Sequence, residues 1–194
     1  MASDSETGTM RHGSHWRITA WAVAVLLLLL PLVAMQLSDE VNWSATDFAF
    51  AGALLIGALL TYELVARTAA NTAYRVAFSV ALAAAVCLVW LSLGVGIIGR
   101  DGDPANLIYF GVLGVGVIGA LLTRFQADGM TRVLLAMALA QTLITAIALI
   151  AGLGQPWSGP LELICLNGFF VALWVGSAWL FRHAARRQTE QGLA

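Results

Sequence analysis

The sequence predicts an all-α integral membrane bundle of six transmembrane helices, with short loops and both termini in the cytoplasm. Of its 194 residues, 60% are hydrophobic and only 11% are charged. Soluble domains are nearer 45–50% apolar, and about a quarter of their residues are charged. Water cannot solvate this much apolar surface, so we expect lipid to surround most of the chain.

Six apolar stretches account for almost the whole chain. Each is long enough to cross about 30 Å of hydrocarbon at 1.5 Å per helical residue. The predicted spans are about 17–37, 47–66, 74–98, 106–123, 131–152 and 161–181. They form one transmembrane domain, 17–182, between an N-terminal tail, 1–16, and a C-terminal tail, 183–194. The short connections predict antiparallel neighbours.

The first span has two interpretations. A cleaved signal peptide would leave five spans, but the apolar run is too long and PLVAMQ offers no good small-x-small cleavage site. We therefore expect a retained helix.

Capping signals mark the starts of the even-numbered spans. Ser44 and Asp47 form a capping-box pattern before the second span. Asp103 followed by Pro104 places a cap residue before a first-turn proline at the fourth. Pro160 and Glu162 resemble that arrangement at the sixth. These signals indicate that the even-numbered spans all begin on the same side of the membrane, antiparallel to the odd-numbered spans.

The arginines give the orientation. Nine lie at one set of helix ends, and only Arg100 lies at the other. The positive-inside rule places the nine in the cytoplasm, together with both termini. The nine are Arg11, Arg17, Arg67, Arg75, Arg124, Arg132, Arg182, Arg186 and Arg187.

A short sequence recurs in two spans. Ile56-Gly-Ala-Leu-Leu-Thr61 reappears as Ile118-Gly-Ala-Leu-Leu-Thr123, and Val175–Leu180 is a looser copy. Three related hairpins would explain this, since parallel repeats occur in transporters. The alternative is chance, because small-residue helix packing selects the same letters.

Intramembrane polar residues are the candidate functional residues, since burying them in lipid is costly. Gln141 is the deepest, and either bonds to another helix or contacts a substrate near the midplane. A second candidate is an outward-facing ligand pocket where the even-numbered helices begin, although capping alone explains part of it. Its residues are Asp47, Asn106, Tyr109, Glu162 and Asn167.

Glu63 and Arg67 form a candidate ion pair. They are four residues apart, in the order that favours a helical ion pair. We interpret the pair as structural. A proton-carrying carboxyl is the alternative, although the neighbouring cation would favour the ionised form.

The sequence gives no sign of catalysis or of a bound cofactor. His12, His15 and His183 all lie in the tails, so bis-histidine haem ligation within the bundle is excluded. We find no nucleophile–base set, zinc-protease pattern or acid–base pair. We expect no enzyme activity, no cofactor and no metal site.

Several runs resemble a group of small bacterial inner-membrane proteins of unknown function. They include Val41-Asn-Trp43, Tyr62–Arg67, Gly96-Ile-Ile-Gly99, Asp103–Asn106 and Leu166–Trp174, and the likeness covers about 20–182. The resemblance implies a bacterial inner membrane and no particular activity.

Two functions remain open. The first is a small-molecule transporter or substrate-binding membrane subunit, because the substrate-capture subunits of vitamin transporters are similar in length and helix number. Ala20 and Ala24 resemble the small-residue face with which those subunits dock. The second is a structural or accessory subunit of a larger membrane complex. Membrane lipid is the expected partner, a homo-oligomer or larger complex is left open, and a net charge of −1 gives no reason to expect nucleic acid.

Overall fold

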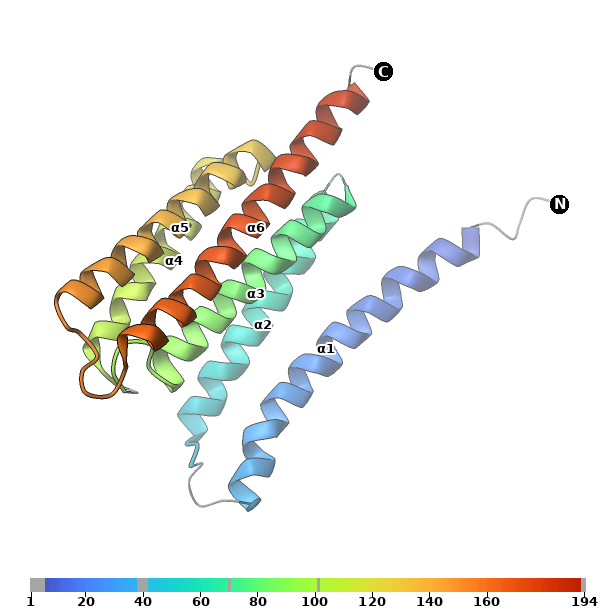
Figure 1. Ribbon diagram of the computed structural model, residues 1–194. Helices are drawn as coiled ribbons and strands as arrows, with labels where there is room; N and C mark the ends of the chain where they lie inside the picture. Colours follow the sequence, from blue (N-terminus) through green and yellow to red (C-terminus); the bar gives the residue numbers. More distant parts are fainter. Residues whose placement is uncertain (1–5, 38–41, 70, 101, 193–194) are drawn as a thin grey trace. The chain divides into compact units, whose positions relative to one another are not determined.

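The computed structural model describes residues 6–37, 42–69, 71–100 and 102–192. These residues form helices and turns, and no strand occurs among them. Six helical segments are long and apolar enough to cross a membrane, which confirms the predicted all-α fold with six membrane-spanning helices (Figure 1). The elements are α1 (Glu6–Leu37), α2 (Ala45–Thr68), α3 (Thr72–Gly94), the 3₁₀ helix η1 (Pro104–Ile108), α4 (Tyr109–Leu122), α5 (Ala127–Ile150) and α6 (Pro160–Gly192).

Some helix ends differ from the prediction. α3 ends at Gly94 rather than at 98, because the backbone N–H groups of Val95 and Gly96 both turn back to the carbonyl of Leu91. Gly96 has a φ of 82°, a left-handed conformation that glycine adopts easily and that ends a helix.

The connection between α4 and α5 is tighter than predicted, so α5 begins at Ala127 rather than at 131. Arg124 and Phe125 adopt left-handed φ values of 50° and 58°, which reverse the chain within four residues. The two tails also contain helix. α1 begins at Glu6 within the predicted 1–16 tail, and α6 continues to Gly192 within the predicted 183–194 tail.

The chain divides into two compact units, Met1–Leu64 and Val65–Ala194. In the first unit, Ala24 on α1 and Ala51 on α2 are buried, so the small-residue face predicted at Ala20 and Ala24 is partly covered. The indole Nε1 of Trp21 donates to Oε1 of Glu63 at 3.2 Å and links the two helices.

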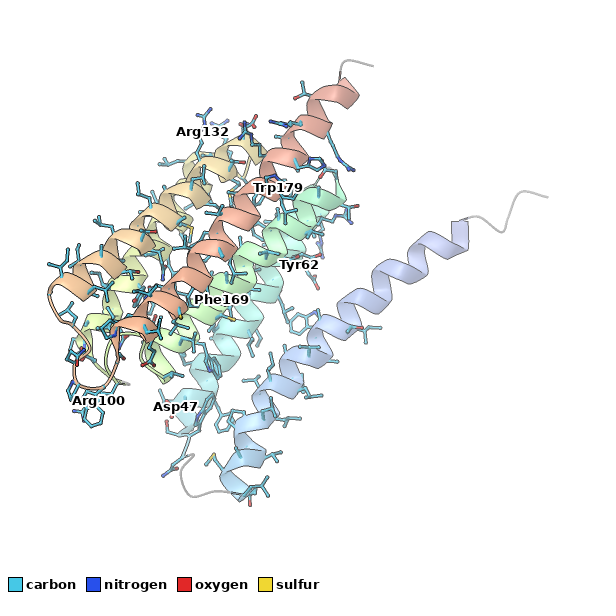
Figure 2. All side chains as sticks on the ribbon, in the orientation of Figure 1. Asp47, Tyr62, Arg100, Arg132, Phe169 and Trp179 are labelled. Carbon is cyan, nitrogen blue, oxygen red and sulfur yellow. The ribbon has the colours of Figure 1, made fainter. Side chains whose placement is uncertain are left out.

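The second unit is an antiparallel bundle of α3, α4, α5 and α6 (Figure 1). α6 packs against α3 and α5, and α4 packs mainly against α5. A buried stripe follows α6 at helical spacing, while Phe169 and Trp179 point outward from the same helix (Figure 2). The stripe consists of Leu163, Asn167, Phe170, Trp174, Ala178, Phe181 and Ala185.

Two glycines allow α4 and α5 to pack closely. A Cβ atom on Gly119 would lie 2.6 Å from Cγ2 of Val133, and one on Gly116 would lie 2.8 Å from Sδ of Met137. A Cβ atom at Gly111 or Gly114, on the same helix, would have no neighbour within 4 Å. Of these four glycines, Gly116 and Gly119 therefore form the packing face, as small residues do between membrane helices.

Interhelical contacts fix the register of the bundle. The hydroxyl of Ser177 donates to the carbonyl of Ala77, and Nδ2 of Asn71 donates to the carbonyl of Ala184. Residue numbers therefore increase along α3 as they decrease along α6, so the two helices are antiparallel. Extending this pairing at the same rise per residue puts Ser92 at about the level of Leu163. We call the end with the α3–η1 and α5–α6 loops the two-loop end, and the end with the α4–α5 turn the turn end.

Candidate functional site

Gln141 and Asn167 meet inside the bundle. Gln141 on α5 is 0% exposed and Asn167 on α6 is 1% exposed. The amide Nε2 of Gln141 donates to Oδ1 of Asn167 at 2.9 Å. The sequence singled out both residues, and the structure brings them together in one interhelical hydrogen bond.

A second hydrogen bond fixes the orientation of both amides. Nδ2 of Asn167 donates to the backbone carbonyl of Leu163 at 2.9 Å, one turn earlier on α6. The Oδ1 atom of Asn167 must therefore face Gln141, and Gln141 must point its Nε2 group, the donor, towards that oxygen. This leaves the amide oxygen Oε1 of Gln141 buried without a hydrogen-bond partner.

Tyr109 completes the group from a third helix. It is the first residue of α4, it is 0% exposed, and its hydroxyl lies beside the side chain of Asn167. The hydroxyl oxygen Oη forms no hydrogen bond within ordinary distance and angle limits. We call Tyr109, Gln141 and Asn167 the amide–tyrosine cluster.

The cluster has hydrogen-bonding capacity but no formal charge. Oε1 of Gln141 accepts hydrogen bonds, and the Tyr109 hydroxyl both donates and accepts. A buried polar group without a partner costs about 1–3 kcal/mol. Two such atoms, Oε1 of Gln141 and Oη of Tyr109, occur on neighbouring helices of the bundle.

Two further unpartnered polar atoms are buried in the second unit. They are Oγ of Ser92 on α3 and Nε1 of Trp174 on α6. Trp174 lies seven residues after Asn167 on the same buried stripe, about 10 Å further along the axis. Neither residue stands out in the sequence, because serine and tryptophan are ordinary in membrane helices and neither interrupts an apolar run.

Asn106 organises the two-loop end. Its Oδ1 accepts from the backbone N–H groups of Ile97 and Ile98, at 2.8 and 2.9 Å. Its Nδ2 donates to the carbonyls of Ile98 and Arg100, at 3.1 and 3.2 Å. These four bonds use the full capacity of an asparagine amide. The side chain thus holds the α3–η1 loop, and its predicted ligand role stays a prediction.

Ser158 joins the two loops. Its hydroxyl accepts from the N–H of Gly99 and donates to the carbonyl of the same residue, both at 3.0 Å. Gly99 and Gly154 lie so close that a Cβ on Gly154 would be 3.1 Å from the nitrogen of Gly99. The guanidinium carbon of Arg100, labelled in Figure 2, lies 5.9 Å from the ring centroid of Trp157.

Asp47 and Glu162 occupy helix starts. Asp47 accepts from the backbone N–H and hydroxyl of Ser44, at 2.7 and 2.8 Å, which confirms the predicted capping interaction. Glu162 is exposed in the first turn of α6. Asp47 belongs to the first unit and the other pocket candidates to the second, so the single pocket stays a prediction.

Glu63 takes part in a contact that the sequence did not indicate, the hydrogen bond from Trp21. Its predicted ion pair with Arg67 stays a prediction. A tryptophan four residues into the first predicted span gives no signal of pairing with a carboxylate on the next helix, because that contact depends on helix rotation.

The chain was compared with protein-family models, characterised proteins and solved structures, and no match was found in any of the three.

Proposed function

We propose that this polytopic membrane protein is a small-molecule transporter or substrate-binding membrane subunit, and that the amide–tyrosine cluster is its binding site. The observation that carries the proposal is the pair of unpartnered atoms, Oε1 of Gln141 and Oη of Tyr109, on neighbouring helices. A bound molecule that hydrogen-bonds to both atoms would remove their desolvation cost.

The position of the cluster supports this proposal. Polar residues within transmembrane segments commonly mark substrate pathways, and transporter sites often lie where a helix is discontinuous. Tyr109 lies where the 3₁₀ helix η1 gives way to α4. Asn167 lies seven residues into α6, about 10 Å from the two-loop end.

The arginine distribution gives the proposal a direction. If the arginine-rich ends are cytoplasmic, the two-loop end faces the exterior of a bacterial inner membrane. The Ser158–Gly99 bonds then lie between the cluster and the external solution. We propose that the ligand enters from this side and that the protein binds or moves it without catalysing a reaction.

Native mass spectrometry tests the proposal directly. The wild-type protein, extracted gently from its own membrane, should release a discrete small-molecule mass on collisional activation. Gln141→Leu should lose that mass, because leucine cannot accept a hydrogen bond. Thr142→Val is the matched control, since Thr142 is exposed and its hydroxyl bonds only to the Ala138 carbonyl of its own helix.

Two results would contradict the proposal. One is a wild-type spectrum containing only protein and lipid, and the other is a small molecule retained equally by Gln141→Leu and by wild type. A co-extracted second polypeptide in place of a small molecule would favour the accessory-subunit function instead.

One observation favours that second function. Gly168, Ala172 and Gly176 share one exposed face of α6, and a Cβ atom on either glycine would have no neighbour within 4 Å. Small residues at this spacing allow another helix to approach closely. Crosslinking in the native membrane tests it, since an accessory subunit should yield a specific heteromeric product. The bulk that Gly168→Leu adds to this face should abolish that product.

A further inference from the structure

We infer that the ligand of the amide–tyrosine cluster is a small uncharged molecule that carries at least one N–H or O–H group. This inference rests on the proposed function and names the ligand class of the same site. It follows from the direction of each hydrogen bond in the cluster and from the distribution of charge along the four helices.

The hydrogen-bond directions require a donor on the ligand. The orientation of Asn167 is fixed, because its Nδ2 bonds to Leu163 and its Oδ1 accepts from Gln141. The unpartnered atom of Gln141 is the carbonyl oxygen, which can only accept. A ligand at this level must therefore donate an N–H or O–H to Gln141.

Tyr109 completes the recognition. Its hydroxyl proton needs an acceptor, and its oxygen can accept a further hydrogen bond. A ligand that donates to Gln141 and accepts from Tyr109 has both functions close together, as in an amide, a urea or a polyol. A hydrocarbon would leave both protein atoms without partners.

The charge distribution disfavours an ion. The span of α4, Pro104–Leu122, contains no ionisable side chain except tyrosine. The charged residues of α5, Asp128 and Arg132, lie in its first two turns. Those of the α6 span are Glu162, which is exposed in the first turn, and the arginines from Arg182 onward. The only charged residue of α3 is Arg75, in its first turn. An ion at the cluster would therefore lose its hydration shell with no charged side chain of these four helices at its level.

Trp174 marks a second position of matching polarity. Its Nε1 is a buried donor without a partner, about 10 Å deeper than Asn167 on the same face of α6. A neutral molecule with an acceptor group can bond there after it leaves Gln141. The amide–tyrosine cluster and Trp174 together suit a neutral solute that both accepts and donates hydrogen bonds. Neither position has a charged side chain that would stabilise an ion.

Flux through proteoliposomes tests the ligand class with two matched pairs. Urea and guanidinium share a planar shape, as do acetamide and acetate, and each pair differs by one charge. We expect the full-length protein to raise urea and acetamide flux above that of protein-free liposomes, with no increase for guanidinium or acetate. Gln141→Leu should lower the neutral fluxes about tenfold, and Thr142→Val should not.

Tyr109→Phe keeps the test decisive if Gln141→Leu fails to fold. It removes a hydroxyl that has no partner, so folding should be preserved while the neutral flux falls. Guanidinium or acetate flux that depends on Gln141 or Tyr109 would overturn the ligand class and leave the proposed function standing. If no probe shows a flux that depends on the cluster, the ligand class fails, whereas the proposed function fails only if the native mass spectrum also shows no small molecule that depends on Gln141.

Discussion

The two halves of the α3–α6 bundle differ in whether all their buried polar side-chain atoms have partners. Towards the turn end, side-chain hydroxyl groups donate hydrogen bonds to backbone carbonyls of another helix or of the α4–α5 turn. Ser177 donates to the Ala77 carbonyl at 2.7 Å, and Tyr74 donates to the Phe125 carbonyl at 2.6 Å. From Trp174 to the two-loop end, four buried polar atoms have no partner, on Ser92, Tyr109, Gln141 and Trp174.

The difference separates polar groups that hold helices together from polar groups that are free to bind something else. Interhelical hydrogen bonds in membranes contribute about 1 kcal/mol each. This stabilisation explains why polar residues occur at the turn end. The unpartnered atoms cost free energy in the same environment. The comparison is open to test, because the chain offers the same substitution in both halves.

The largest stability effect should come from glycine packing. Gly119→Ala places a methyl group 2.6 Å from Cγ2 of Val133, and such overpacking costs about 1–3 kcal/mol. Gly111→Ala meets nothing within 4 Å and should be neutral or stabilising, because alanine favours helices by up to about 1 kcal/mol. Thermal unfolding in detergent measures both. Equal midpoints would show that the α4–α5 contact is looser than described.

The two buried tyrosines should respond oppositely to loss of the hydroxyl. Tyr74→Phe removes the bond that holds the left-handed Phe125 turn and should cost about 1–2 kcal/mol. Tyr109→Phe removes an unpartnered hydroxyl and should leave stability unchanged or raise it. Chemical denaturation in mixed micelles compares them. A larger loss for Tyr109→Phe would reverse the comparison between the halves.

A serine pair repeats the comparison with smaller side chains. Ser177→Ala loses the bond to Ala77 and should cost about 0.5–1.5 kcal/mol. Ser92→Ala deletes a buried hydroxyl without a partner, so the midpoint of unfolding should stay the same or rise. If Ser92→Ala is the more destabilising, Ser92 has a structural partner in the folded protein.

The most local effect should come from the loop contact. Ser158→Ala removes two hydrogen bonds between the loops at the two-loop end, with little change in the helices. We expect faster exchange of the Gly99 backbone amide and a modestly higher neutral flux, because the loops separate more readily. Hydrogen–deuterium exchange measures the first. Unchanged Gly99 protection would mean that another contact closes this end.

Hydropathy was enough to predict the six helices, because every span needs about 20 apolar residues whatever it packs against. It was not enough to predict which residues face one another. α4 is apolar on all sides, so its sequence does not reveal that Gly119 faces Val133 while Gly111 faces open space. Helix rotation of that kind is set by tertiary packing.

The candidate site was predicted in part for the same reason. Gln141 and Asn167 stood out because amides are costly in lipid, but their mutual bond depends on the register of α5 and α6. Asn106 was expected in a ligand pocket, and its four bonds to the α3–η1 loop depend on a backbone shape that sequence does not display. Trp174 carries a polar atom hidden within a large apolar side chain, so hydropathy overlooks it.

The most direct test of the central claim is an experimental structure of the protein extracted gently from its own membrane, at a resolution that shows ordered waters. We expect non-protein density larger than a water molecule, within about 3.2 Å of both Oε1 of Gln141 and Oη of Tyr109. Side chains rotated so that both atoms bond to protein, or a single bridging water, would contradict it and assign the amide–tyrosine cluster to packing.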